Sequence, residues 1–115
     1  MMELSEVQID SVTAVAVKGR VDSTTAGALK DRLVGLVGTG HAHLVVDFKD
    51  VDYISSAGFR TLLIASKAAE ESGGRLVLCG INGEVRRLFE IGAFTEFFQI
   101  LPSREEAAAS IKPPA

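Results

Sequence analysis

The sequence predicts a single α/β domain with a mostly parallel sheet of four to five strands. Short apolar runs, typical of buried strands, alternate with segments whose apolar residues recur every three or four positions, as on one side of a helix. The chain has 115 residues, the size of one ordinary domain, and contains no repeat or linker. Strands that alternate with helices in this way are joined by right-handed crossovers. We expect the domain to span residues 1–115, with residues 1–2 and 112–115 frayed.

The strands are predicted by apolar runs and by alternation of apolar with polar residues. The predicted strand at residues 3–9 is half-exposed. The apolar run at residues 44–46 is too short for most helices, so it is assigned to a strand. The five segments are residues 3–9, 12–17, 44–46, 75–79 and 97–101. A polar corner is expected after the third run, and Tyr53 and Ile54 then bring the chain back toward the core.

The helices are predicted where a capping residue precedes an apolar pattern with helical spacing. Ser, Thr, Asn and Asp cap helices because their side-chain oxygens accept hydrogen bonds from unpaired amides of the first turn. Glycines close the first three helices, at Gly38, Gly73 and Gly92. The caps are expected at residues 22–25, at Ser55 and Ser56, at Asn82, and at Ser103 with Glu106.

The composition excludes several classes of function. Twelve basic residues against 15 acidic ones give a formal net charge of −3, and the basic residues are scattered, which argues against nucleic-acid binding. No apolar run approaches the roughly 20 residues of a membrane span, and the first residues lack the basic and apolar blocks of a signal peptide. The one cysteine, Cys79, permits no internal disulfide and suits a reducing compartment. We therefore expect a cytoplasmic protein that binds no nucleic acid and does not insert into membranes.

The candidate functional residues gather at one edge of the predicted sheet. In a parallel α/β sheet, binding groups lie outside the carboxyl ends of the strands. Residues 19–23, 53–58 and 80–83 are the corners at that edge, so Asp22 and Ser56 should lie close together. Both residues could equally be no more than helix caps.

The corner at residues 53–58 also begins the central helix. Ala57 and Gly58 carry no bulk there, so their amides should be approachable from outside. The N-terminus of a helix favours a negative group.

These residues resemble the signature of the STAS family, the anti-sigma factor antagonists and their relatives. That family shows an apolar strand, an acidic residue, and then Asp-Ser-Ser-Gly or Asp-Ser-Thr-Gly at the start of a helix. The corresponding residues here are Ser55-Ser56-Ala57-Gly58, so Ser55 stands in place of the family's aspartate. Residues 19–26 are similar to the family's Gly-x-x-Asp turn. The resemblance implies that the strands lie mostly in sequence order, with helices largely on one face.

The resemblance also implies the function of an anti-sigma factor antagonist in a partner-switching circuit. The unphosphorylated form would bind an anti-sigma factor, a serine kinase that uses ATP, and so free a sigma factor. The kinase would phosphorylate Ser56, in preference to Ser55, and a separate phosphatase would restore the serine. The chain itself would need no cofactor and no small-molecule substrate. The alternative is a docking subunit of a transporter or sensory complex without phosphorylation, which the missing aspartate at Ser55 favours.

A stripe along the central helix is a candidate surface for the partner. Its residues recur at spacings of three or four, so they share one side of the helix, and they are Ser56, Arg60, Ile64, Lys67 and Glu71. Ile64 is an apolar residue on this charged flank. It is either an ordinary exposed isoleucine or an anchor for a partner. The residues expected to bind the partner are Asp22, Ser55, Ser56, Gly58, Arg60 and Ile64, and the role of Asp22 is implied by the resemblance alone.

The sequence carries no catalytic or metal-binding pattern. A serine nucleophile needs a base to activate it, but His41 and His43 lie at the amino end of the central strand, at the wrong edge of the sheet. No cysteine or carboxylate cluster accompanies the two histidines, and no glycine-rich phosphate loop is present. Cys79 is expected to be a small core residue. We therefore expect no enzymatic activity and no metal site.

Overall fold

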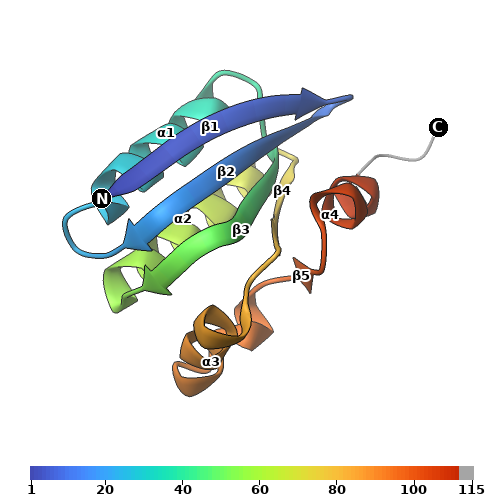
Figure 1. Ribbon diagram of the computed structural model, residues 1–115. Coiled ribbons are helices and arrows are strands. Elements are labelled where there is room, and N and C mark those ends of the chain that lie inside the picture. The colour runs from blue at the N-terminus through green and yellow to red at the C-terminus, as the bar shows by residue number, and fades with distance from the viewer. Residues whose placement is uncertain (112–115) are drawn as a thin grey trace.

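The computed structural model describes residues 1–111 and contains one five-stranded sheet in the order β1-β2-β3-β4-β5 (Figure 1). The strands are β1 (Met2–Ile9), β2 (Val12–Val21), β3 (His43–Ile54), β4 (Arg75–Cys79) and β5 (Ile100–Leu101). The helices are α1 (Ala26–Gly38), α2 (Ser56–Glu71), α3 (Gly83–Ile91), the short 3₁₀ helix η1 (Thr95–Phe97) and α4 (Arg104–Ile111). Only β1 is antiparallel to its neighbour, so the predicted, mostly parallel sheet in sequence order is confirmed.

Three of these helices cover one face of the sheet. Figure 1 shows α1 and α2 side by side behind the strands, and α3 contributes to the same apolar core. The buried residues of α1 have the predicted spacing, and they are Ala26, Leu29, Leu33 and Val37. Burying one large apolar side chain contributes about 1.5–3 kcal/mol to folding, so this core fixes how α1 and α2 lie against each other.

Helix α4 packs on the opposite face of the sheet, where its small residues approach the strands closely. Ala107, Ala108 and Ile111 form a second core with buried side chains of β2, β3 and β4. An ion pair that the sequence did not predict anchors the first turn of this helix: Arg104 Nε donates to the nearly buried Asp47 Oδ2 at 3.1 Å. Asp47 Oδ1 also accepts from the Lys49 amide at 2.9 Å, so the buried carboxylate is paired and hydrogen-bonded.

Strand β3 is longer than the sequence predicts, and the expected polar corner is wrong. Residues 47–52 continue the strand, with Val51 buried while Asp50 and Asp52 are exposed. This stretch still pairs with β2, although the register shifts between Ala16 and Lys18. Such irregularities bend a strand and increase its twist. The stretch that carries Asp50 and Asp52 therefore remains part of β3 instead of forming a corner.

The two ends of the chain also differ from expectation. Residues 1–2 are not frayed, since Met2 pairs with Gly19 and the Met1 carbonyl accepts from the Arg20 amide at 3.2 Å. The strand predicted over residues 97–101 comprises only Ile100 and Leu101, and Phe97 belongs to η1 instead. Residues 112–115, also expected to be frayed, lie outside the described residues.

Candidate functional site

The carboxyl ends of β2 and β3 form one corner of the molecule. The Ser55 amide donates to the Val21 carbonyl at 2.8 Å, which ties the two strand ends together. Asp22 and Ser56, the next residues of each segment, therefore lie at the same corner as expected. The third predicted corner is joined to β3 as well, because Asn82 Nδ2 donates to the Val51 carbonyl at 2.9 Å.

Asp22 organises the turn that leads into α1. Its Oδ1 accepts from the Thr24 amide at 2.9 Å and from the Thr24 hydroxyl at 2.7 Å. These bonds stabilise the carboxylate, so the pKa of Asp22 lies below its ordinary value, with a smaller contribution from Arg20. Asp22 does not cap α1 itself, whose N-cap is Thr25 without a side-chain capping bond. It caps the preceding turn.

Ser55 and Ser56 have different roles at the start of α2. Ser55 is the N-cap, with an extended backbone, and its Oγ accepts from the Gly58 amide at 3.4 Å. Ser56 is the first helical residue and is exposed. Its hydroxyl forms no hydrogen bond with any side chain or backbone group of residues 1–111. The cap fixes the turn, and the neighbouring hydroxyl stays free.

Gly58 is buried, so the expectation of an approachable amide at this position is wrong. Its amide already bonds Ser55, and a Cβ atom added there would lie 2.6 Å from Ile54 Cγ1 and 2.8 Å from Val21 Cγ1. Glycine is needed here because α2 begins directly against the ends of β2 and β3. Gly58 shapes the site from beneath and offers no contact surface.

A hollow of about 580 Å³ lies between the two adjacent helices, and we call it the α1–α2 hollow. Its lining residues come from the turn before α1 and from the N-terminal parts of both helices, and they are Ser23, Ala26, Gly27, Lys30, Ser56, Ala57, Arg60, Thr61 and Ile64. It thus unites three predicted site residues, and Ile64 is 43% exposed in it, as expected for an outward flank. The full predicted stripe on α2, including Lys67 and Glu71, is exposed.

Lys30 is the one charged residue of this hollow that the sequence analysis missed. It lies on α1, one residue after the buried Leu29, on a flank that the sequence shows to be polar. Which flank of α1 faces α2 depends on how the two helices pack on the sheet. No pattern within α1 alone could have identified it.

Other chemistry-bearing residues form no site. No three His, Cys, Asp or Glu side chains within residues 1–111 are placed to hold a metal ion. Cys79 is fully buried, and burial, together with Asp47, raises the pKa of its thiol to about 12. The thiol therefore stays protonated and unreactive, as predicted. No helix in the described part of the chain has the length and apolar character to cross a membrane.

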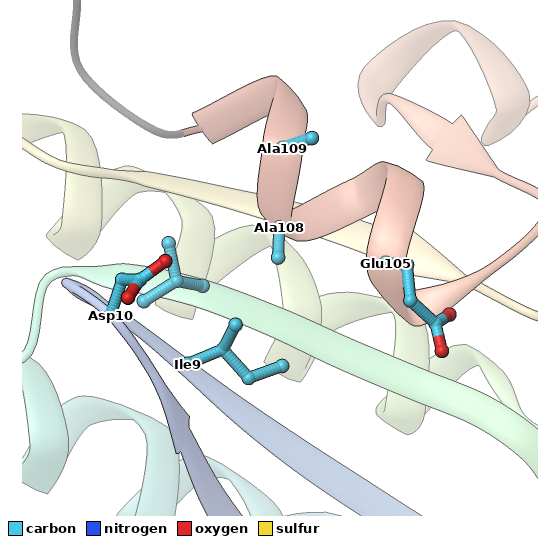
Figure 2. A pocket seen from close by; sticks show the side chains of 6 residues that line it. Ile9, Asp10, Glu105, Ala108 and Ala109 are labelled. Atoms are coloured by element: carbon cyan, nitrogen blue, oxygen red, sulfur yellow. The ribbon is translucent and has the colours of Figure 1, made fainter. Parts of the chain in front are cut away.

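A smaller hollow of about 220 Å³ lies on the opposite face of the sheet, between the β1–β2 turn and α4. Figure 2 shows Ile9 and Asp10 on one side of it and Ala108 and Ala109 on the other. None of the predicted site residues lines it. The candidate site is therefore the corner of Asp22 and Ser56 together with the α1–α2 hollow.

Comparisons with known proteins agree with this fold. Residues 4–107 match the model of the STAS domain family. The chain is 39% identical over 111 residues to BtrV of Bordetella bronchiseptica, a candidate anti-sigma factor antagonist, with 96% of each chain covered. An anti-sigma factor antagonist of Mycobacterium paratuberculosis has a similar structure, with a TM-score of 0.87 at 20% identity over 98% of this chain and 96% of that one. The phosphorylated form of the Bacillus cell fate determinant SpoIIAA also aligns, with a TM-score of 0.72 at 15% identity over 97% and 100%.

Proposed function

Because the chain belongs to the STAS domain family, we propose that it acts as an anti-sigma factor antagonist in a partner-switching circuit. The observation that carries this proposal is the exposed hydroxyl of Ser56, which lines the α1–α2 hollow and forms no hydrogen bond within residues 1–111. The similarity to BtrV over 96% of each chain supports the same role. The protein acts through binding and is not an enzyme.

The proposed partner is an anti-sigma factor that is also a serine kinase. The unphosphorylated antagonist binds this kinase and so releases a sigma factor. In the kinase, Ser56 Oγ attacks the γ-phosphorus of ATP. The new Oγ–P bond forms as the bond from that phosphorus to the β–γ bridging oxygen breaks, ADP leaves, and the hydroxyl proton passes to a base of the kinase. A phosphatase then hydrolyses the phosphoester and restores the serine.

The antagonist takes part in this step as a substrate. No histidine lies beside Ser56, since His41 and His43 lie before and at the amino end of β3, so the chain offers no histidine base to activate this serine. ATP belongs to the kinase, and the antagonist needs no cofactor. The circuit places the protein in the cytoplasm with its partners.

Ser55 in place of the family aspartate is compatible with this function. Serine and aspartate are both strong N-cap residues, and Ser55 performs that task here by accepting from the Gly58 amide. The substitution removes a charge beside Ser56 but keeps the turn that presents it. The alternative is a docking subunit without phosphorylation, and the identity of the captured partner distinguishes it from the switch.

The proposal is tested by capturing the partner from lysate of the native cells with the immobilised domain and identifying it. We expect a protein with a serine-kinase ATP-binding domain. Binding of the purified kinase is then measured with ADP bound, so that no phosphate is transferred. Capture of a transporter or receptor subunit, with no kinase that binds the purified domain, would contradict the proposed function.

Asp22→Ala is expected to weaken binding of the kinase while leaving the melting temperature nearly unchanged. Thr25 keeps the corner closed without the carboxylate, because its hydroxyl accepts from the Asp22 amide at 2.9 Å and donates to the Arg20 carbonyl at 2.8 Å. Asp31→Ala, an exposed aspartate of α1 outside the α1–α2 hollow, is the matched control. A large fall in melting temperature with binding intact would make Asp22 purely structural.

Ile64→Asp is expected to give a folded protein that binds the kinase weakly. Ile64 is 43% exposed, so a charge there stays hydrated in the free domain but must lose water when the partner packs on it. Ile91→Asp is the matched control, since Ile91 is 76% exposed at the end of α3, outside the hollow. Calorimetric titration with the purified kinase checks both variants. Equal affinities for the two variants would remove Ile64 from the interface.

A further inference from the structure

The α1–α2 hollow contains two cations and no acidic side chain. Lys30 projects into it from α1 and Arg60 from α2, and Ser56 lines the same space. The ion pairs found within residues 1–111 join other cations: Lys18, Arg20, Arg32 and Arg104. The hollow is therefore locally positive on a chain whose formal net charge is −3.

We propose that this hollow is a binding site for the phosphoryl group carried on Ser56, with Lys30 and Arg60 as its ligands. The proposal rests on the phosphorylation of Ser56 proposed above. A phosphoserine brings a charge of about −1.5 to −2 near pH 7 and three acceptor oxygens. Two cations facing the modified residue match that charge.

The positions of the two cations suit the phosphoryl group. Arg60 follows Ser56 by four residues, and side chains four apart on a helix begin about 5–6 Å from each other. The guanidinium presents several donors in one plane and can bond two phosphate oxygens at once. Lys30 closes the other side of the hollow as a flexible point charge. The phosphate would thus be held between the two helices.

The backbone of α2 supplies only part of this binding. The amide of Gly58 donates to Ser55 Oγ, and the amide of Phe59 donates to the Ser55 carbonyl at 3.0 Å. These two donors of the first turn are already used. The nearby carboxylate of Asp22 already has its own partners. Its Oδ1 accepts a hydrogen bond from the Thr24 amide, and its Oδ2 lies 3.7 Å from Arg20 Nε. Lys30 and Arg60 therefore provide the charge that the phosphate needs.

Binding of the phosphate in the hollow would weaken partner binding in a second way, in addition to repulsion between the phosphate and the partner. Once phosphorylated, the domain would neutralise Lys30 and Arg60 with its own phosphate and fill the part of the hollow beside Ser56. A partner that uses the open hollow would lose both the cations and the space. The antagonist's own residues, Lys30 and Arg60, would then stabilise the inactive state.

The test uses domain in which phosphoserine is incorporated at position 56 during translation, so that no kinase is needed. The second pKa of the phosphate is measured by ³¹P NMR titration, folded and in urea. We expect the folded value to be lower by about half a unit or more. In the Lys30→Gln/Arg60→Gln double variant, more than about half of this difference should disappear, and the remainder is the contribution of the α2 backbone. Lys67→Gln, an exposed cation of the same helix outside the hollow, should keep the full shift.

Two results would overturn the proposal. One is a folded pKa that the double variant leaves unchanged, and the other is an equal loss of the shift in Lys67→Gln, which would indicate a general field effect. Neither result bears on whether Ser56 is phosphorylated in the cell, because the phosphate is installed during synthesis. Conversely, a partner kinase that never phosphorylates Ser56 would refute the proposed function and leave the measured pKa shift as it stands.

Discussion

A phosphate on Ser56 is expected to weaken binding of the partner kinase more than about a hundredfold, since each 1.4 kcal/mol is a factor of ten and a penalty of about 3 kcal/mol suffices. In the proposed active form, the partner surface packs against the hydroxyl of Ser56, which is exposed in the free domain. In the phosphorylated form it would have to desolvate a dianion beside Asp22. The domain itself should stay folded, because the modified residue lies at the helix N-terminus, which tolerates negative charge.

Three variants check this expectation by calorimetric titration with the kinase. Ser56→Ala should bind constitutively and accept no phosphate. Ser56→Asp carries part of the charge, so it should bind weakly while its circular dichroism matches the parent. Ser55→Ala is the neighbouring control and should still respond to phosphorylation. Normal binding by Ser56→Asp would argue against charge at this position as the switch.

Phe89→Ala is expected to lower the free energy of unfolding by about 3–5 kcal/mol, the usual cost of truncating a buried phenylalanine. Phe89 of α3 is fully buried and meets three other rings edge-on: Phe48 at 6.3 Å, Phe59 at 4.7 Å and Phe98 at 6.0 Å between centroids. Its removal leaves a cavity beneath the first turn of α2, because Phe59 lies in that turn.

Urea unfolding of Phe89→Ala is best compared with Phe97→Ala. Phe97 is 62% exposed in η1 and touches only Phe94 among the aromatic rings of residues 1–111. The exposed truncation should change stability by less than about 1 kcal/mol. Similar losses in the two variants would show that the aromatic cluster does not hold α3 to the rest of the domain.

The elements that the sequence predicts well are those with local signals. Asn82 caps α3 by accepting from the Val85 amide at 2.9 Å, and Ser103 accepts from the Glu106 amide at 3.2 Å. Both bonds join residues three apart, so the residue types alone reveal them. The apolar spacing of α1 and the exposed stripe of α2 were predictable for the same reason.

The features that the sequence did not reveal depend on contacts between distant segments. Asp47 pairs with Arg104 across 57 positions, and Gly58 is required by side chains of two strand ends. Lys30 joins the candidate site only because α1 packs beside α2. These roles depend on contacts between segments that are distant in the sequence, so local sequence patterns could not predict them.

Phosphopeptide mapping of the protein purified from its native cells tests the central claim most directly. The account predicts a single phosphoryl group on Ser56, absent from Ser56→Ala and retained in Ser55→Ala. Modification confined to Ser55, or equal labelling of Ser56→Ala and the parent, would contradict the assignment of the site. If neither serine is ever labelled while Ser56→Asp binds its partner normally, the docking-subunit alternative replaces the switch.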